Sequence, residues 1–203
     1  MTTTRPIVYI VDDDFSFREG VDNLLRSVGY TTVCFASVDE FAKHPCADAP
    51  SCILLDVRMP GKSPLDFQIE RRNVSDNIPI VFLTGHGDVP MSVSTMKNGA
   101  VNFLLKPFRE QELLDAIREG VDRDARRRMA EESVNDLLSC MRSLSDRERQ
   151  ILTLVSNGQS NKEIARAVGL QEITVKVHRG KAMRKMKATS VADLVKKFQL
   201  IER

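Results

Sequence analysis

Five short apolar segments alternate with longer stretches of helical periodicity in the N-terminal part of the chain. The segments that predict strands are Ile7–Val11, Thr31–Phe35, Cys52–Asp56, Ile80–Thr84 and Val101–Leu105. Helical patterns lie between them near residues 15–27, 37–43, 64–72 and 90–97, and a fifth begins near residue 109. All but the second strand segment are almost wholly apolar, which is typical of strands buried on both faces of a parallel sheet. The pattern therefore predicts an α/β domain.

Five strand–helix units within residues 1–122 fit a flavodoxin-like, doubly wound, five-stranded parallel sheet. Such sheets place functional groups at the carboxyl ends of their strands. Five polar side chains stand at the end of a predicted strand or directly after one: Asp12, Asp13, Asp56, Thr84 and Lys106. An aspartate run after a strand can instead be a helix cap with solvated charge. Polar features on the correct ends of four strands nevertheless favour a reactive site.

The clustered carboxylates at this edge of the sheet would repel one another, so they need a cation. Ligands that are all oxygen atoms suit Mg²⁺. Lys106 could pair with Asp56 and later with an incoming anion.

Four motifs carry a resemblance over residues 5–120: VYIVDDD, ILLDVRMPG, IVFLTGHGD and NFLLKPF. Together they resemble the receiver domain of bacterial two-component response regulators. The resemblance implies that Asp56 accepts a phosphoryl group, that Thr84 and Lys106 contact this group, and that Phe103 is the switch aromatic. It also implies a Mg²⁺ site formed by Asp12, Asp13, Asp56 and the backbone carbonyl of Arg58.

Three helices are predicted early in the C-terminal segment, residues 143–203, and capping signals mark their ends. Ser145 and Ser160 each have a glutamate three residues later, which is the pattern of a capping box at a helix start. Gly169 ends the second helix, and the third begins near residue 171. Two short helices joined by a glycine turn predict an all-α helix-turn-helix domain.

The third of these helices combines an apolar face with a basic face. Val175, Ala182 and Met186 repeat at helical spacing on one side, whereas Lys176 and Val177 lie on another side among further basic residues. A basic helical face suits the phosphate-lined groove of DNA. Weaker alternatives are a basic helix that only solubilises the protein and a helix that lies on a membrane surface.

The motifs LSDRERQIL, SNKEIA and TVKVH resemble the LuxR-type helix-turn-helix domain. The resemblance implies a set of DNA-binding residues on the third helix: Thr174, Lys176, Val177, Gly180, Lys181, Arg184 and Lys185. Lys176 and Val177 would face bases, and Gly180 stands where many relatives have lysine or asparagine. A last helix, Val191–Phe198, resembles the element through which these domains pair.

Residues 123–142 connect the two predicted domains and are highly charged, with sparse apolar positions. The helix that begins near residue 109 could continue through this segment as a helical linker. The segment could equally be a flexible tether, and the sequence leaves both interpretations open.

Charge divides the chain at the same place. Residues 1–122 hold 12 Lys+Arg against 18 Asp+Glu, a net charge of −6, and residues 123–203 hold 18 against 10, a net charge of +8. The basic half suggests a polyanionic partner. No apolar run has the length of a bilayer span, the start MTTTRPIVYIVDDD does not resemble a signal peptide, and the four cysteines lack metal-ligand spacing. These features predict a cytoplasmic protein without a membrane partner.

A receiver joined to a LuxR-type domain is the FixJ/NarL type of response regulator. By that resemblance we expect a sensor histidine kinase as phosphoryl donor, a homodimer on phosphorylation, double-stranded promoter DNA as ligand, and RNA polymerase as a further partner. A Mg²⁺-dependent phosphatase of haloacid-dehalogenase type is the enzyme alternative. It would need a second acid two residues after Asp56, where the chain has Arg58, so we do not expect an enzyme. A DNA-binding protein with an unphosphorylated receiver would not need the full set of strand-end residues.

Overall fold

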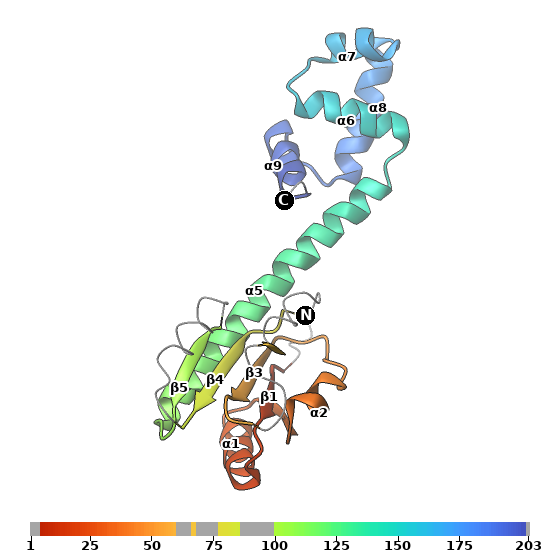
Figure 1. The fold of residues 1–203 in the computed structure, drawn as a ribbon. Helices are drawn as coiled ribbons and strands as arrows, with labels where there is room; N and C mark the ends of the chain where they lie inside the picture. Colours follow the sequence, from red (N-terminus) through yellow and green to blue (C-terminus); the bar gives the residue numbers. More distant parts are fainter. Residues whose placement is uncertain (1–4, 60–65, 68–76, 86–99, 202–203) are drawn as a thin grey trace. The chain divides into compact units, whose positions relative to one another are not determined.

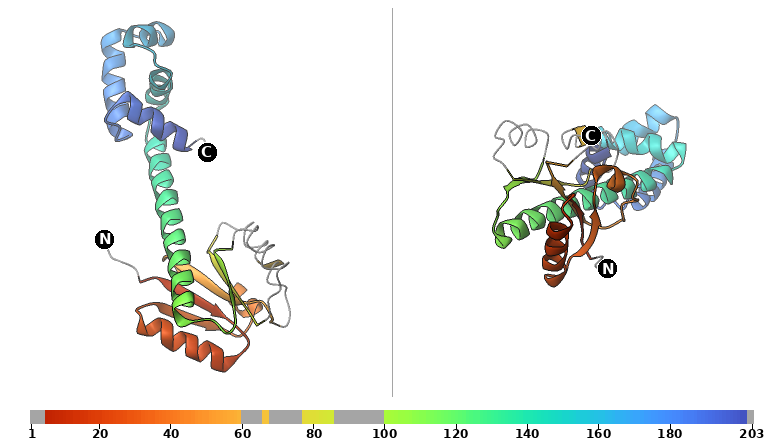
Figure 2. Two further views of the ribbon diagram at one scale, coloured as in Figure 1. Left: turned by 90° about the vertical axis from the view of Figure 1, so that its left-hand side faces the viewer. Right: turned by 60° about the horizontal axis from the view of Figure 1, so that its bottom comes forward.

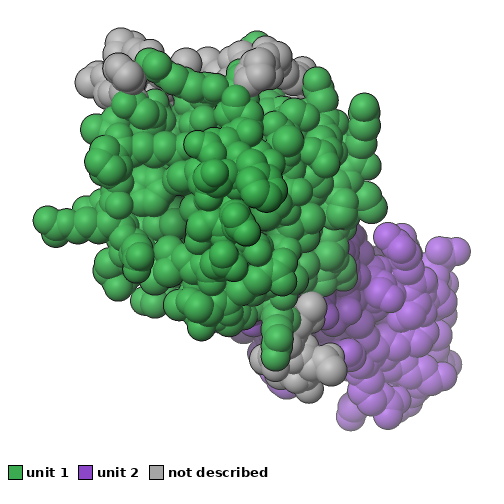
Figure 3. All heavy atoms as spheres, turned by 90° about the horizontal axis from the view of Figure 1, so that it is seen from below, with its two compact units in different colours: residues 1–128 green, residues 129–203 purple. Residues whose placement is uncertain are grey.

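The computed structural model describes residues 5–59, 66–67, 77–85 and 100–201. The chain divides into two compact units, Met1–Arg128 and Met129–Arg203, which are coloured separately in Figure 3. The helices predicted near 64–72 and 90–97 lie outside the described residues, apart from Asp66 and Phe67, which are helical.

The first unit is built on a five-stranded parallel sheet with the order β2-β1-β3-β4-β5 (Figure 1). The strands are β1 Ile7–Val11, β2 Thr31–Phe35, β3 Ser51–Asp56, β4 Ile80–Thr84 and β5 Asn102–Leu105. Only the starts of β3 and β5 differ from the prediction, each by one residue. This strand order is that of flavodoxin-like sheets, so the predicted fold class is confirmed.

Alternating side chains of the central strands supply two separate cores. Val8 and Ile10 of β1 pack with β3, β4 and the helices α1 (Phe15–Ser27) and α5 (Glu110–Arg142). Tyr9 and Val11 point to the opposite face, where α2 (Val38–Ala42) packs. Figure 2 shows the sheet with these helices from two further directions. Because successive residues of a strand face opposite sides, a strand covered on both faces must be apolar throughout.

Helix α5 approaches β3 closely at Gly120. A Cβ built on Gly120 would lie 2.5 Å from the Sγ of Cys52 in β3, so a larger residue here would force the Cys52 side chain or the helix to shift. One turn later, the buried carboxylate of Asp124 accepts a hydrogen bond of 2.9 Å from the backbone N–H of Ser51, the first residue of β3. The close approach and this bond together fix α5 to the start of β3.

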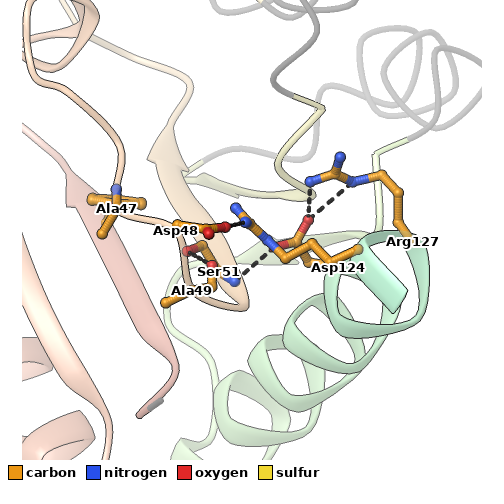
Figure 4. A network of polar contacts seen from close by, with 8 residues as sticks. Ala47, Asp48, Ala49, Ser51, Asp124 and Arg127 are labelled. Atoms are coloured by element: carbon orange, nitrogen blue, oxygen red, sulfur yellow. Dashed lines mark hydrogen bonds and ion pairs between the residues drawn. The ribbon is translucent and has the colours of Figure 1, made fainter. Parts of the chain in front are cut away.

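Two arginines complete the network around Asp124 (Figure 4). Arg127 donates to Oδ1 from Nη2 at 2.6 Å and from Nε at 3.1 Å, and Arg128 donates to Oδ2 from Nε at 2.7 Å. Arg128 also donates to Asp48 at 2.6 Å. A carboxylate with no exposed surface is thereby neutralised, as buried charges must be.

Residues 123–142, for which the sequence leaves a helix and a tether open, lie within the continuous helix α5. Its 33 residues cross the boundary between the two compact units. The division of the chain at residues 122 and 142 stays a prediction.

The second unit contains α6 (Asp146–Ser156), α7 (Asn161–Val168), α8 (Glu172–Lys185) and α9 (Val191–Ile201). Both predicted capping boxes are present, at Ser145 and at Ser160, and Gly169 ends α7 with a φ of 67°. Val175 and Ala182 of α8 are buried in one core with residues of α6, α7 and α9. In the part of the chain that the structure describes, no helix has the combination of length and apolarity that crossing a bilayer requires.

Candidate functional site

Three aspartates meet at the carboxyl edge of the sheet. Asp56 is the last residue of β3, and Asp12 follows β1, whose Val11 pairs with Leu55. The adjacent ends of these paired strands therefore bring the carboxylates together. Asp12, Asp13 and Asp56 each offer one carboxylate oxygen, and these three atoms all lie within 4.8 Å of one another. The clustering expected from the strand ends is thus present in the structure.

Lys106, the residue after β5, supplies a cation to this cluster. Its Nζ lies 2.6 Å from Oδ2 of Asp12 and 3.7 Å from Oδ1 of Asp56. The sequence suggests the pair with Asp56, and the structure adds Asp12 as the nearer partner. Three carboxylates against one ammonium leave a formal charge of −2. An all-oxygen donor set with this excess charge fits a divalent cation such as Mg²⁺.

The environment of Asp56 makes its carboxylate more basic than usual. Burial raises its pKa, the Lys106 ammonium opposes the shift, and the Asp12 carboxylate adds to it. The net direction is upward, because desolvation disfavours the charged form. A carboxylate that water stabilises poorly holds its electron pair less tightly and is a better nucleophile.

Thr84 and Phe103 lie on the two strands beyond Asp56. Leu83 of β4 pairs with Asp56, so the buried Thr84 is one residue past that partner at the same edge. The half-buried Phe103 of β5 packs near Phe82, with ring centroids 6.5 Å apart. Arg58 is exposed in the segment after β3.

Two residues of α1 also belong to this site, although the sequence did not single them out. The Phe17 ring centroid lies 3.7 Å from Nζ of Lys106, and Arg18 donates to the backbone carbonyl of Asp12 at 2.5 Å. Asp14 caps the same helix, since its side chain accepts a hydrogen bond from the Phe17 N–H. The one sequence feature that could have indicated Phe17 and Arg18 is their position in the first turn of the helix that follows the aspartates.

The second unit presents the predicted DNA-binding residues on α8. Val175, Ala182 and Met186 have no exposed surface, as their predicted core role requires. Thr174 is half-buried, and the other members of the predicted set are exposed: Lys176, Val177, Gly180, Lys181, Arg184 and Lys185. An exposed helix face with several basic residues can approach a polyanion without repacking the core.

Lys185 differs from the other basic residues because its ammonium already has partners. It donates to Oε2 of Glu148 at 2.7 Å and to the carbonyl of Ser143 at 2.9 Å. The hydrogen bond from Lys185 is the main reason that the pKa of Glu148 is lowered. In this arrangement Lys185 joins the end of α8 to the start of α6, and contact with a DNA phosphate would require it to exchange these partners.

Comparisons with known proteins give one family match in each compact unit. Residues 8–118 match the family described as "Response regulator receiver domain", and residues 142–198 match "Bacterial regulatory proteins, luxR family". The chain belongs to the response regulator receiver family, and it carries a LuxR-type domain after the receiver.

Named relatives match over almost the whole chain. Nodulation protein W of Bradyrhizobium diazoefficiens is 50% identical, over 96% of this chain and 86% of that protein. The response regulator protein TodT of Pseudomonas putida is 43% identical, over 97% and 86%. Among solved structures, the response regulator StyR shares 46% identity with a TM-score of 0.87, over 97% of this chain and 99% of that one. Full-length FixJ from B. japonicum shares 33% identity with a TM-score of 0.57, over 98% of each chain.

The two domains and these relatives define the class of protein. The chain is a phosphorylation-dependent transcriptional regulator of the FixJ/NarL type. The receiver implies a histidine kinase as its partner, and the LuxR-type domain implies that the chain binds DNA.

Proposed function

We propose that Asp56 is the phospho-acceptor and that its phosphorylation controls promoter binding by α8. The observation that carries this proposal is the position of Asp56: it ends β3 with Lys106 at 3.7 Å and two further carboxylates alongside. An Oδ atom of Asp56 attacks the phosphorus of a phosphohistidine on a sensor kinase. The O–P bond forms as the P–N bond breaks, and the histidine nitrogen keeps the electron pair.

Charge control at this edge is the main contribution of the protein to the transfer. Asp12, Asp13, Asp56 and the backbone carbonyl of Arg58 would hold Mg²⁺, which supplies positive charge next to the transferring group. Lys106 already lies between Asp12 and Asp56 and can move its ammonium to the incoming phosphoryl oxygens.

Signal output then depends on Thr84 and Phe103. The Thr84 hydroxyl, at the end of the strand beside β3, can donate to a phosphoryl oxygen. Its displacement opens space for Phe103, which is half-buried, to turn further inward. Phosphorylation would thereby bias an existing equilibrium between two conformations and favour a homodimer through the region of β5.

DNA recognition would use the exposed side of α8. Lys176 and Val177 would contact base edges in the major groove, and Lys181 and Lys185 would lie nearer the phosphates, Lys185 after exchanging its present partners. Thr174, Gly180 and Arg184 complete the proposed interface. A dimer bound in this way at a promoter would be placed to contact RNA polymerase.

Mass spectrometry of the intact protein after incubation with acetyl phosphate and Mg²⁺ tests the acceptor directly. We expect the wild type to gain the mass of one phosphoryl group and Asp56→Asn to gain none, because an amide is a poor nucleophile. Asp14→Asn is the matched control, since it changes a neighbouring exposed carboxylate that caps α1 and lies outside the cluster. Labelling of Asp56→Asn to the wild-type level would refute the assignment.

A further inference from the structure

Two apolar side chains of α8 are exposed and take no part in the core of this unit. Ile173 has 64% of its surface exposed, and Val177 has 50%. The core of this unit takes Val175 and Ala182 from the same helix, and Met186 from the position that follows it. Because residues four apart lie one above the other on a helix, Ile173 and Val177 form one continuous apolar strip.

The apolar strip continues into a position without a side chain. Gly180 follows Val177 by three residues and so lies on the same face. Apart from its chain neighbours and the backbone of α8 itself, no described atom lies within 4 Å of a Cβ built at Gly180, so internal packing does not require glycine there. The strip of Ile173, Val177 and Gly180 is therefore open to a ligand along its whole length.

The surroundings of the strip indicate which ligand fits. Lys176, Lys181 and Arg184 are exposed on the same helix. Basic side chains beside an apolar strip match a DNA groove, where phosphates line the edges and base edges form the floor. Ile173 is the second residue of α8, and the N-terminal residues of a recognition helix are the ones that contact base edges.

We propose that Ile173 is a specificity-determining residue that contacts the 5-methyl group of a thymine in the major groove. With Val177 it forms an apolar pair that selects thymine over cytosine at adjacent positions of the target. Thymine presents a methyl group to the major groove, whereas cytosine presents an N4–H₂ donor. Isoleucine buries the methyl group favourably but leaves the amino group without a hydrogen-bond partner. This inference rests on the proposed DNA-binding role of α8.

Uracil substitution tests the inference because uracil lacks only the methyl group of thymine. A duplex is first selected from a randomised pool with the full-length protein treated with acetyl phosphate and Mg²⁺. Each thymine of that duplex is then replaced by uracil, and binding of wild type, Ile173→Ala and Met129→Ala is compared. Met129 is the matched control, an apolar residue on α5 with 67% exposure.

At the thymine that Ile173 contacts, uracil should weaken wild-type binding about fourfold, as loss of one buried methyl group does. At that position the same replacement should have no effect on Ile173→Ala, because the methyl group has already lost its partner. Met129→Ala should behave as the wild type. Replacing that thymine by 5-methylcytosine should weaken wild-type binding less than replacing it by cytosine.

Three results would overturn the proposal in distinguishable ways. If Ile173→Ala bound DNA with the affinity of the wild type and remained equally sensitive to uracil, Ile173 would not contact a thymine methyl group. If Ile173→Ala bound DNA normally but lost self-association, the strip would face a second copy of the chain. Failure of the wild type to enrich any duplex would contradict the DNA-binding role of α8 itself.

Discussion

Replacement of Asp124 by alanine tests how α5 is held to the receiver. The Asp124 carboxylate has no exposed surface and accepts from the Ser51 N–H and from both Arg127 and Arg128. Alanine removes all of these acceptors at once. The backbone N–H of Ser51, which is also fully buried, would lose the partner that the carboxylate provides.

The expected loss of stability is large for a single substitution. Removing one partner of a buried ion pair costs about 3–5 kcal/mol, and leaving a buried N–H without its partner costs about 1–3 kcal/mol. The side chains of Arg127 and Arg128 are 23% and 22% exposed, so water can recover part of the ion-pair contribution. We therefore expect a loss of about 2–4 kcal/mol in the free energy of unfolding of the receiver.

Tyrosine fluorescence during urea unfolding reports this unit alone. The chain has no tryptophan, and both tyrosines, Tyr9 and Tyr30, lie in the receiver. With a urea dependence of about 2 kcal/mol/M, the midpoint should fall by about 1–2 M. Asp48→Ala is the control, since Asp48 pairs with the same Arg128 but its side chain is fully exposed, and little change is expected. Equal midpoints for wild type and Asp124→Ala would refute the idea that this network anchors α5.

Three further substitutions test other parts of the structure. Gly120→Ala should destabilise the receiver by about 1–3 kcal/mol in the same assay, because the new Cβ meets Cys52; an unchanged midpoint would contradict the close approach. The pKa of Glu148 is lowered by Lys185, so the stability this pair gives should be complete above the ordinary value of 4.5 and fall as the pH drops through the lowered pKa. Amide hydrogen exchange in α6 and α8 should show this loss in the wild type but not in Glu148→Gln. Without Mg²⁺, Asp56→Asn should raise the urea midpoint by relieving carboxylate repulsion, whereas added Mg²⁺ should stabilise the wild type more than the variant; equal responses would exclude Asp56 as a ligand.

Most of the residues at the carboxyl edge of the sheet could be predicted because the buried strands are easy to recognise in the sequence. Buried parallel strands must be apolar on both faces, so each polar residue at a strand end, such as Asp56 or Lys106, is conspicuous. Strand order then determines which ends are neighbours. The same logic identified the core face of α8, since Val175 and Ala182 repeat with the period of a helix.

Contacts set by tertiary packing could not be predicted in the same way. Asp124 lies in a charged segment where an aspartate normally faces water, and only the packing of α5 against β3 buries it. Phe17 reaches Lys106 because of where α1 lies beside the sheet. Lys185 looks like any other basic residue of α8, and its contact with Glu148 depends on how α6 and α8 cross.

Phosphorylation of Asp56 as the control of DNA binding is the central claim. The most direct test is the affinity of the full-length chain for its selected duplex, before and after treatment with acetyl phosphate and Mg²⁺. The account predicts that treatment strengthens binding by the wild type and leaves Asp56→Asn unchanged. An equal gain in affinity by Asp56→Asn would contradict it.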